Sequence, residues 1–255
     1  MTDDDRFEAL LAHAGGAMVG WDFGYLSRTG RMTEAPLPWS YASIVIDEMA
    51  PARSMLDMGT GGGEFLAALQ PLPPDVRATE GWAPNIPVAK ARLEPLGVAV
   101  HGFASEDELL PYPEATFDLV INRHEAYDPA EVRRVLKPGG RFITQQVGGR
   151  NDRELNDWLA APPETDYGFW TLDFARDQLE TAGFTIVDAR EAFVAERCYD
   201  IGALVFYLNA VPWQVNGFSV ERFRPLLREL HERISRGGFL DLTCHRFLLV
   251  AETPS

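Results

Sequence analysis

Met55-Leu56-Asp57-Met58-Gly59-Thr60-Gly61-Gly62-Gly63-Glu64-Phe65 is the stretch that decides the fold of this chain of 255 residues. Its apolar start predicts a buried strand, its glycines predict a tight turn, and the residues after them predict a helix. Glycine has no Cβ atom, so the backbone of such a turn allows a ligand to approach closely. The stretch therefore predicts a strand, turn and helix that bind a ligand, and the alternative is a tight turn without one.

The spacing of the glycines distinguishes between three kinds of ligand. A dinucleotide fingerprint, G-x-G-x-x-G/A counted from Gly59, would need Gly or Ala at the position of Glu64. A phosphate-binding loop would need a Gly-Lys-Ser/Thr sequence, and this loop has no lysine. Glu64 also places a carboxylate in the first helical turn, where it would repel a pyrophosphate. The loop therefore favours a cofactor without phosphate groups.

Two acidic residues end neighbouring predicted strands. Asp57 lies two residues before Gly59, at the carboxyl end of its strand, where it can face a cationic group. Glu80 follows about twenty residues later, where a carboxylate can accept hydrogen bonds from both hydroxyls of a ribose. A surface carboxylate at a strand end is ordinary, so the interpretation of Glu80 depends on its spacing from the loop.

From Arg53 onward, short apolar runs alternate with helical patterns, which is typical of βαβ units and a parallel sheet. We expect strands near residues 53–58, 76–80, 98–101, 117–122, 141–147, 184–189 and 242–251. We expect helices near residues 62–70, 85–96, 129–136, 171–181 and 220–236. The third of these helices should stop at Lys137-Pro138-Gly139-Gly140, because proline cannot continue it and glycine accepts the conformation that follows.

A family resemblance emerges when these motifs are combined. The D-x-G-x-G-x-G pattern at residues 57–63, Glu80, Phe117-Asp118-Leu119-Val120 and Leu136-Lys137-Pro138-Gly139-Gly140 together resemble the class I S-adenosylmethionine-dependent methyltransferases of the methyltransferase type 11 group. The resemblance covers residues 53–147. It implies an α/β fold, with a Rossmann-like, seven-stranded, mainly parallel sheet, helices on both faces and an antiparallel last strand.

The resemblance also implies which residues bind the cofactor, S-adenosyl-L-methionine. In that family the glycine loop contacts the methionyl and ribose portions, the acid after the second strand holds the ribose, and a polar loop after the third strand receives the adenine amine. The positions carried over are Asp57, Gly59, Thr60, Gly61, Gly63, Glu80 and Asn122. Residues 104–108 lie one or two residues away from the family's commoner Gly-Asp-Ala-Glu pattern, so Ser105 or Glu106 is expected at the adenine.

The segment after the fourth strand is where chemistry is expected. His124 is the best candidate for a general base, because its ordinary pKa lies near neutrality and its segment ends at the ligand-binding edge of the sheet. The alternative is that His124 and Glu125 hydrogen-bond the loop and cap the helix that begins near Pro129. Gln145 and Gln146 end the next strand at the same edge, where they could hydrogen-bond the substrate, although a polar strand end facing water is the default interpretation.

Composition limits the partners and the location. The formal net charge of −15, with no run of Lys and Arg to offset it, disfavours nucleic acid. Cys198 and Cys244 form no C-x-x-C pair, and the five histidines show no metal-ligand spacing, so no metal is expected. Three aspartates near the start and the absence of a long apolar segment argue against export or a membrane, so we expect a cytoplasmic protein.

Two regions do not follow the βα alternation. We expect residues 1–50 to form an N-terminal arm with helices, and residues 51–255 to form the methyltransferase domain with a helical insertion at about 200–238. Aromatic residues in and near the additions, Trp39 and Trp213 among them, would form a lid or simply bury the added helices. The expected function is methyl transfer to a small metabolite, and the alternatives are an RNA base methyltransferase or a non-catalytic protein that binds S-adenosylmethionine.

Overall fold

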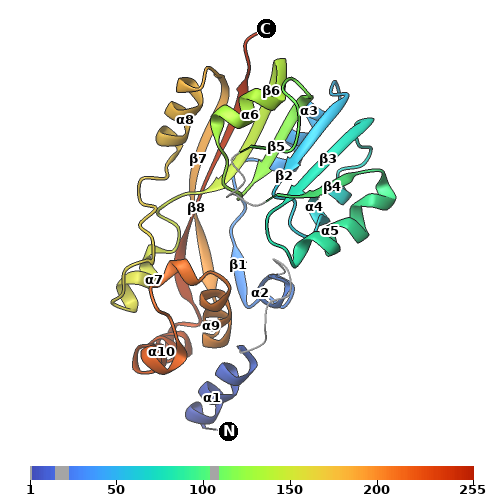
Figure 1. Cartoon of the computed structure of the whole chain (residues 1–255). Helices are drawn as coiled ribbons and strands as arrows, with labels where there is room; N and C mark the ends of the chain where they lie inside the picture. The colour runs from blue at the N-terminus through green and yellow to red at the C-terminus, as the bar shows by residue number, and fades with distance from the viewer. Residues whose placement is uncertain (1, 15–22, 104–108) are drawn as a thin grey trace. The chain divides into compact units, whose positions relative to one another are not determined.

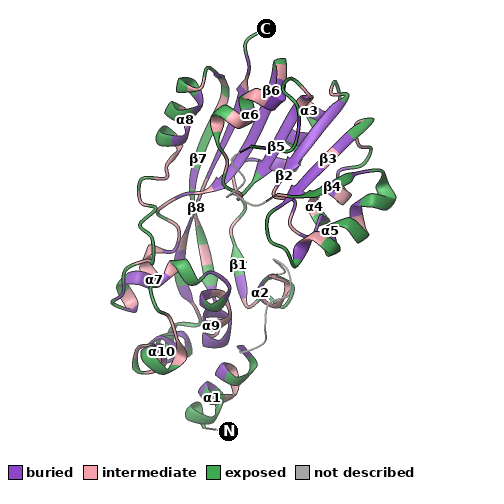
Figure 2. Ribbon diagram, in the orientation of Figure 1, coloured by how far each residue is buried: buried purple, intermediate pink, exposed green. Residues whose placement is uncertain are grey.

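Four parallel pairings bring the carboxyl ends of neighbouring strands to one edge of the sheet. In the computed structural model, which describes residues 2–14, 23–103 and 109–255, strand β2 (Ser54–Met58) lies between β3 (Asp75–Glu80) and β5 (Phe117–Arg123). Strand β4 (Ala99–Gly102) pairs with β3, and β6 (Leu136–Val147) pairs with β5. All residues of β2 are buried, which confirms the predicted buried strand, and Figure 2 shows the central strands in the buried colour.

The register places the strand ends level with one another. Met58 lies opposite Thr79 on one side and Asn122 on the other, and Asn122 lies opposite Thr144 of β6. Residues just beyond these positions therefore meet at the carboxyl edge, where open α/β sheets bind ligands.

Helices cover this parallel sheet. They are α3 (Tyr41–Met49), α4 (Glu64–Ala68), α5 (Asn85–Leu93), followed by the 3₁₀ turn η1 (Glu94–Leu96), α6 (Pro129–Val135) and α8 (Leu172–Thr181). Val132 of α6 and Leu179 of α8 are buried in one cluster with Val120 and Phe142 of the sheet. In Figure 1, α6 lies in front of the strands and α3 behind them, so both faces are covered as predicted.

The sheet contains eight strands, where seven were expected, in the order β1-β7-β8-β6-β5-β2-β3-β4. Strand β8 (Leu240–Glu252) is antiparallel to β6, so the predicted antiparallel last strand is confirmed. Strand β7 (Thr185–Cys198) continues past its expected end at residue 189, and its last residues pair with the short β1 (Met32–Glu34). The added strand comes from the extra length of β7, whose backbone offers hydrogen bonds to a further strand.

The chain divides into two compact units. The first consists of residues 1–37, 148–169 and 192–245, and the second of residues 38–147, 170–191 and 246–255. Strands β7 and β8 each contribute residues to both units. The second unit holds the parallel strands and begins at Pro38, so α3 belongs with the sheet although residues 1–50 were expected to form an arm.

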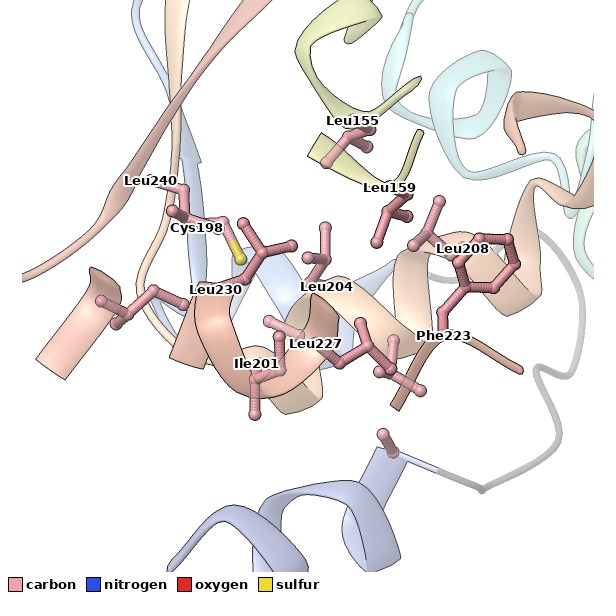
Figure 3. Close-up of a cluster of buried hydrophobic side chains, with 14 of the residues drawn as sticks. Leu155, Leu159, Cys198, Ile201, Leu204, Leu208, Phe223, Leu227, Leu230 and Leu240 are labelled. Atoms are coloured by element: carbon pink, nitrogen blue, oxygen red, sulfur yellow. The ribbon is translucent and has the colours of Figure 1, made fainter. Parts of the chain in front are cut away.

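The first unit has a hydrophobic core of its own. Its helices are α1 (Asp3–Ala14), α2 (Gly24–Ser27), α7 (Arg153–Trp158), α9 (Ile201–Ala210) and α10 (Val220–Gly237), with the 3₁₀ turn η2 (Pro212–Gln214). Figure 3 shows Leu204 and Leu208 of α9 clustered with Leu227 and Leu230 of α10. The buried positions of α10 recur at helical spacing, which confirms the amphipathic helix predicted near residues 220–236.

Among the described residues, no helix combines the length and the apolar character needed to cross a membrane. The role of residues 1–50 and 200–238 as a lid stays a prediction.

Candidate functional site

The glycine loop has the backbone that its sequence predicts. Gly59, Gly61 and Gly63 all have positive φ, at 68°, 62° and 80°. A Cβ atom on Gly59 would stand 2.5 Å from Cγ of Glu125, whereas a Cβ atom on Gly61 would meet no atom of the described residues within 4 Å. Gly59 is therefore required by close packing, and Gly61 is bordered by the open space that an approaching ligand would need.

Glu64 begins α4 directly after the loop, as predicted, but its charge is paired. Its Oε1 lies 2.5 Å from Nη1 of Arg92, and both side chains are partly exposed. The argument that Glu64 repels a pyrophosphate is therefore weaker than the sequence suggests, because an exposed ion pair offsets part of the negative charge. The spacing of the glycines still disfavours a dinucleotide.

Asp57 is buried at the carboxyl end of β2. Burial, with a smaller contribution from the negative charge of Glu80, raises the pKa of its carboxyl group from 3.8 to about 7. The Thr60 side chain and the Arg123 guanidinium favour the ionised form and only partly oppose this rise. A cation beside Asp57 would therefore stabilise its ionised form.

Glu80 is buried at the end of β3, next to the glycine loop. Its Oε1 accepts a hydrogen bond from the backbone N–H of Trp82 at 2.8 Å. Burial raises the pKa of Glu80, and neighbouring backbone N–H groups, that of Gly61 among them, partly offset this effect. Glu80 also lies close enough to Asp57 for its negative charge to raise the pKa of that acid.

Glu125 completes a group of three carboxylates, with Asp57 and Glu80. It is half-buried against Gly59, and its pKa is raised by burial and by the negative charge of Glu80. The sequence pattern did not assign Glu125 to the cofactor, although its position after the fourth strand of the motif was the available signal. Three acids with raised pKa values beside one glycine loop form a site that favours a positively charged ligand.

Asn122 is fully buried at the end of β5. Its Oδ1 accepts hydrogen bonds from Oγ1 of Thr144 at 3.0 Å and from Nε2 of Gln146 at 2.7 Å. Its Nδ2 is buried without a hydrogen-bond partner among the residues that the structure describes. A buried amide donor without a partner is costly, so this atom is suited to a ligand oxygen.

Gln145 and Gln146 are buried, so the expectation that they face water is wrong. Gln146 Nε2 donates to Asn122 and also lies 3.1 Å from the backbone oxygen of Glu125. Gln145 Oε1 accepts a hydrogen bond from Nε1 of Trp39 at 2.9 Å. Trp39, which the sequence suggested as a lid residue, lies just before α3 and is buried. Its indole N–H supplies the hydrogen bond that the buried amide oxygen of Gln145 needs.

His124 follows β5 and has a left-handed backbone with φ of 65°. Its Nε2 lies 3.3 Å from Nε2 of Gln145. His124 is an exposed residue, but desolvation by the neighbouring protein atoms and the charges of Arg246 and Arg123 lower its pKa. The imidazole is therefore neutral at pH 7.

The alternative in which His124 or Glu125 caps the next helix does not match the structure. Asp128 is the N-cap of α6, and its Oδ1 accepts hydrogen bonds from the backbone N–H groups of Ala130 and Glu131 at 2.7 and 3.1 Å. The backbone N–H of His124 donates to the oxygen of Gln145 in β6, so this bond extends the pairing of β5 with β6. Of the other expected site residues, Thr60 is buried in the loop, and Ser105 and Glu106 lie outside the described residues.

No group of three or more His, Cys, Asp or Glu side chains is arranged to hold a metal ion within the described ranges.

Residues 56–144 match the family model described as a methyltransferase domain. An uncharacterized methyltransferase of Mycobacterium tuberculosis (strain H37Rv) is 30% identical over 211 residues, which cover 74% of this chain and 79% of that protein. The chain belongs to the class I S-adenosylmethionine-dependent methyltransferases. The matched range of this methyltransferase contains Asp57, the glycine loop, Glu80 and Asn122.

Two further similarities place this methyltransferase among known proteins. A ubiquinone biosynthesis O-methyltransferase of Cereibacter sphaeroides (strain KD131) is 28% identical over 153 residues, which cover 53% of this chain and 62% of that enzyme. The crystal structure of the YcgJ protein of Bacillus subtilis matches with a TM-score of 0.58 at 17% identity, covering 84% of this chain and 98% of that one. The second similarity supports the fold alone.

Proposed function

We propose that this methyltransferase transfers a methyl group from S-adenosyl-L-methionine to a small-molecule acceptor. The observation that carries the proposal is the group of Asp57, Glu80 and Glu125, three acids with raised pKa values beside a glycine loop. The cofactor carries a sulfonium and an ammonium group, and a bound cation would relieve the repulsion among these acids.

The positions of several atoms support the proposed set of residues that would hold the cofactor. Gly61 leaves open space beside the loop, Glu80 offers carboxylate oxygens to ribose hydroxyls, and Asn122 offers its unpartnered Nδ2. The full proposed set is Asp57, Gly59, Thr60, Gly61, Gly63, Glu80 and Asn122, with Ser105 or Glu106 at the adenine. Glu125 joins this set on the evidence of its packing against Gly59.

The protein's own part in the reaction is alignment and exclusion of water. S-adenosylmethionine supplies an electrophilic methyl carbon on a sulfonium: when the acceptor atom bonds to this carbon, the carbon–sulfur bond breaks and its electron pair stays on sulfur. The buried carboxylates would orient the cofactor without a covalent intermediate, and His124, which lies directly before Glu125 in the chain, is the proposed residue that meets the acceptor.

A small-molecule acceptor is favoured over nucleic acid by charge. The net charge of −15 would repel a phosphate backbone at ordinary ionic strength. The ubiquinone biosynthesis O-methyltransferase that this chain resembles supports an acceptor of small-molecule type, with oxygen as the methylated atom.

Cofactor binding is tested first, by calorimetry and thermal shift with S-adenosylhomocysteine and with NAD as a control ligand. At a hundredfold excess over Kd, the bound ligand should add about 2.7 kcal/mol to the stability of the wild type. Asp57→Asn should lose this gain, while Asp75→Asn, which changes an exposed carboxylate at the start of β3, should keep it. Absence of S-adenosylhomocysteine binding to the wild type would refute the proposal.

The acceptor class is tested with S-adenosylmethionine labelled in its methyl group. We expect label to pass into a filtered bacterial metabolite extract and not into total RNA. Label in RNA would replace the small-molecule proposal by a nucleic-acid methyltransferase. Tight binding of S-adenosylhomocysteine with no labelled product in either sample would indicate a protein that binds the cofactor without catalysis.

A further inference from the structure

Two successive side-chain contacts connect the segment before α3 with the segment after β5. Trp39 Nε1 donates a hydrogen bond to Oε1 of Gln145 at 2.9 Å, and Nε2 of Gln145 lies 3.3 Å from Nε2 of His124. Trp39 and Gln145 have only 9% and 7% of their surface exposed, so water cannot readily replace either partner. The three side chains therefore form one continuous network.

The indole determines which way the Gln145 amide points. An indole N–H can only donate, so the Gln145 atom that faces Trp39 must be the carbonyl oxygen. The NH₂ group of the amide then faces His124, and it too can only donate. The Nε2 atom of His124 must therefore be the acceptor, which means that it carries no proton.

A neutral imidazole has one proton, and with Nε2 acting as the acceptor this proton resides on Nδ1. A second proton would put an N–H group on Nε2, directly against the N–H of Gln145. The charged groups close to His124 add to this preference, since Arg123 and Arg246 are both cationic and lower its pKa. The network and the surrounding charge thus both favour the neutral form.

We propose that Trp39 and Gln145 are positioning residues that hold His124 in its Nδ1–H tautomer, so that His124 meets the methyl acceptor as a hydrogen-bond donor and not as a base. The proposal rests on the proposed function for the identity of the partner, but the tautomer itself is a property of the protein alone. No described residue forms a hydrogen bond with Nδ1, and His124 is an exposed residue, so this N–H group is available to a ligand.

The tautomer restricts the chemistry of the acceptor. A hydrogen-bond donor on Nδ1 fits a methyl acceptor that presents an oxygen lone pair, such as a carboxylate, a carbonyl or a phenolate. It does not fit a group that must give a proton to His124 before methylation, because the lone pair on Nε2 is already occupied by Gln145. Acceptors that are already anionic at pH 7 need no such proton transfer.

The tautomer is tested by long-range ¹H–¹⁵N correlation spectra of uniformly labelled protein at pH 7, without ligand and with S-adenosylhomocysteine. The chain has five histidines, so His124 can be assigned by its disappearance in His124→Asn. We expect an unprotonated Nε2 and a protonated Nδ1. A protonated Nε2 in the wild type, whether in the other neutral tautomer or in a charged ring, would overturn the proposal.

Substitutions separate positioning from a general structural effect. Trp39→Phe removes the donor that orients Gln145, so the Nε2–H tautomer of His124 should become populated. Trp170→Phe makes the same chemical change at another packed indole, and it should leave the His124 spectrum unchanged. Gln145→Glu replaces the donor by a carboxylate and should shift the proton of His124 to Nε2. An unaltered His124 tautomer in both network variants would refute the role of Trp39 and Gln145.

The donor role is tested in the methyl-transfer assay with the filtered metabolite extract. His124→Asn keeps an N–H donor and suits the left-handed backbone, so it should retain most of the activity, while His124→Ala should lose about tenfold. A general base would instead cost about 100-fold or more in both variants, and that result would contradict the proposal. If the wild type itself transfers no methyl group, the proposed function fails while the spectra still decide the tautomer.

Discussion

The side chain of Glu125 occupies the position that a side chain on Gly59 would need. A Cβ atom at Gly59 would stand 2.5 Å from Cγ and 2.6 Å from Cβ of Glu125. The loop after β5 can therefore pack against the glycine loop only because Gly59 has no side chain. This contact brings the third carboxylate to the other two, so the electrostatics of the site depend on it.

Gly59→Ala should destabilise the protein by more than backbone strain alone. The substitution adds a clash with Glu125 to the cost of a positive φ, and we expect a total of about 3 kcal/mol in the free energy of unfolding. Gly97→Ala is the matched control, since Gly97 has φ of 82° and no atom in the described part of the chain lies within 4 Å of its Cβ position. Urea unfolding should show the smaller loss for Gly97→Ala, and equal losses would contradict the packing argument.

Asp57→Asn should stabilise the ligand-free protein at pH 8. The folded-state pKa of Asp57, about 7, lies above its unfolded value, so the folded state binds the proton more tightly and its stability falls as pH rises from about 4 to 7. The amide cannot ionise, so at pH 8 the free energy of unfolding of the variant should exceed that of the wild type by on the order of 4 kcal/mol. In urea titrations the difference in the free energy of unfolding should shrink toward pH 4. A variant less stable than the wild type at both pH values would contradict the raised pKa of Asp57.

Binding of S-adenosylhomocysteine should strengthen with pH. Its ammonium group favours the ionised carboxylates, so a proton must leave Asp57 on binding when the pH is below about 7. We expect Kd to fall by several-fold between pH 6 and pH 8. Calorimetry in two buffers of different ionisation enthalpy should also detect proton release at pH 6. A Kd independent of pH, with no proton release, would argue against an ionised Asp57 in the complex.

Asp128→Ala should lower the free energy of unfolding by about 1 kcal/mol without changing cofactor binding. The loss follows from the two backbone N–H groups of α6 that Asp128 caps. Asp128→Asn keeps a side-chain oxygen and should restore most of the stability. A large change in the Kd for S-adenosylhomocysteine would show that the cap also positions the site.

Local pattern was enough to predict most of the fold. The glycine loop and the parallel strands around it depend on short-range features, namely apolar runs, glycine positions and proline stops, whereas the antiparallel last strand was expected from the family resemblance. The eighth strand was not predictable, because β1 has only three residues and exists through its pairing with the end of β7. Its sequence carries no periodicity that would reveal it.

The residues of the candidate site likewise fall into those that the sequence could predict and those that only the structure shows. Asp57, the three glycines and Glu80 could be proposed from spacing along the chain, because the strand–turn–helix unit places them by itself. Glu125, the burial of Gln145 and the contact between Trp39 and Gln145 depend on residues far apart in sequence. The sequence alone determined the family and the loop that would hold the cofactor. Only the tertiary structure decided the tautomer of His124, because a proton's position depends on which hydrogen-bonding groups the folded chain brings next to the ring.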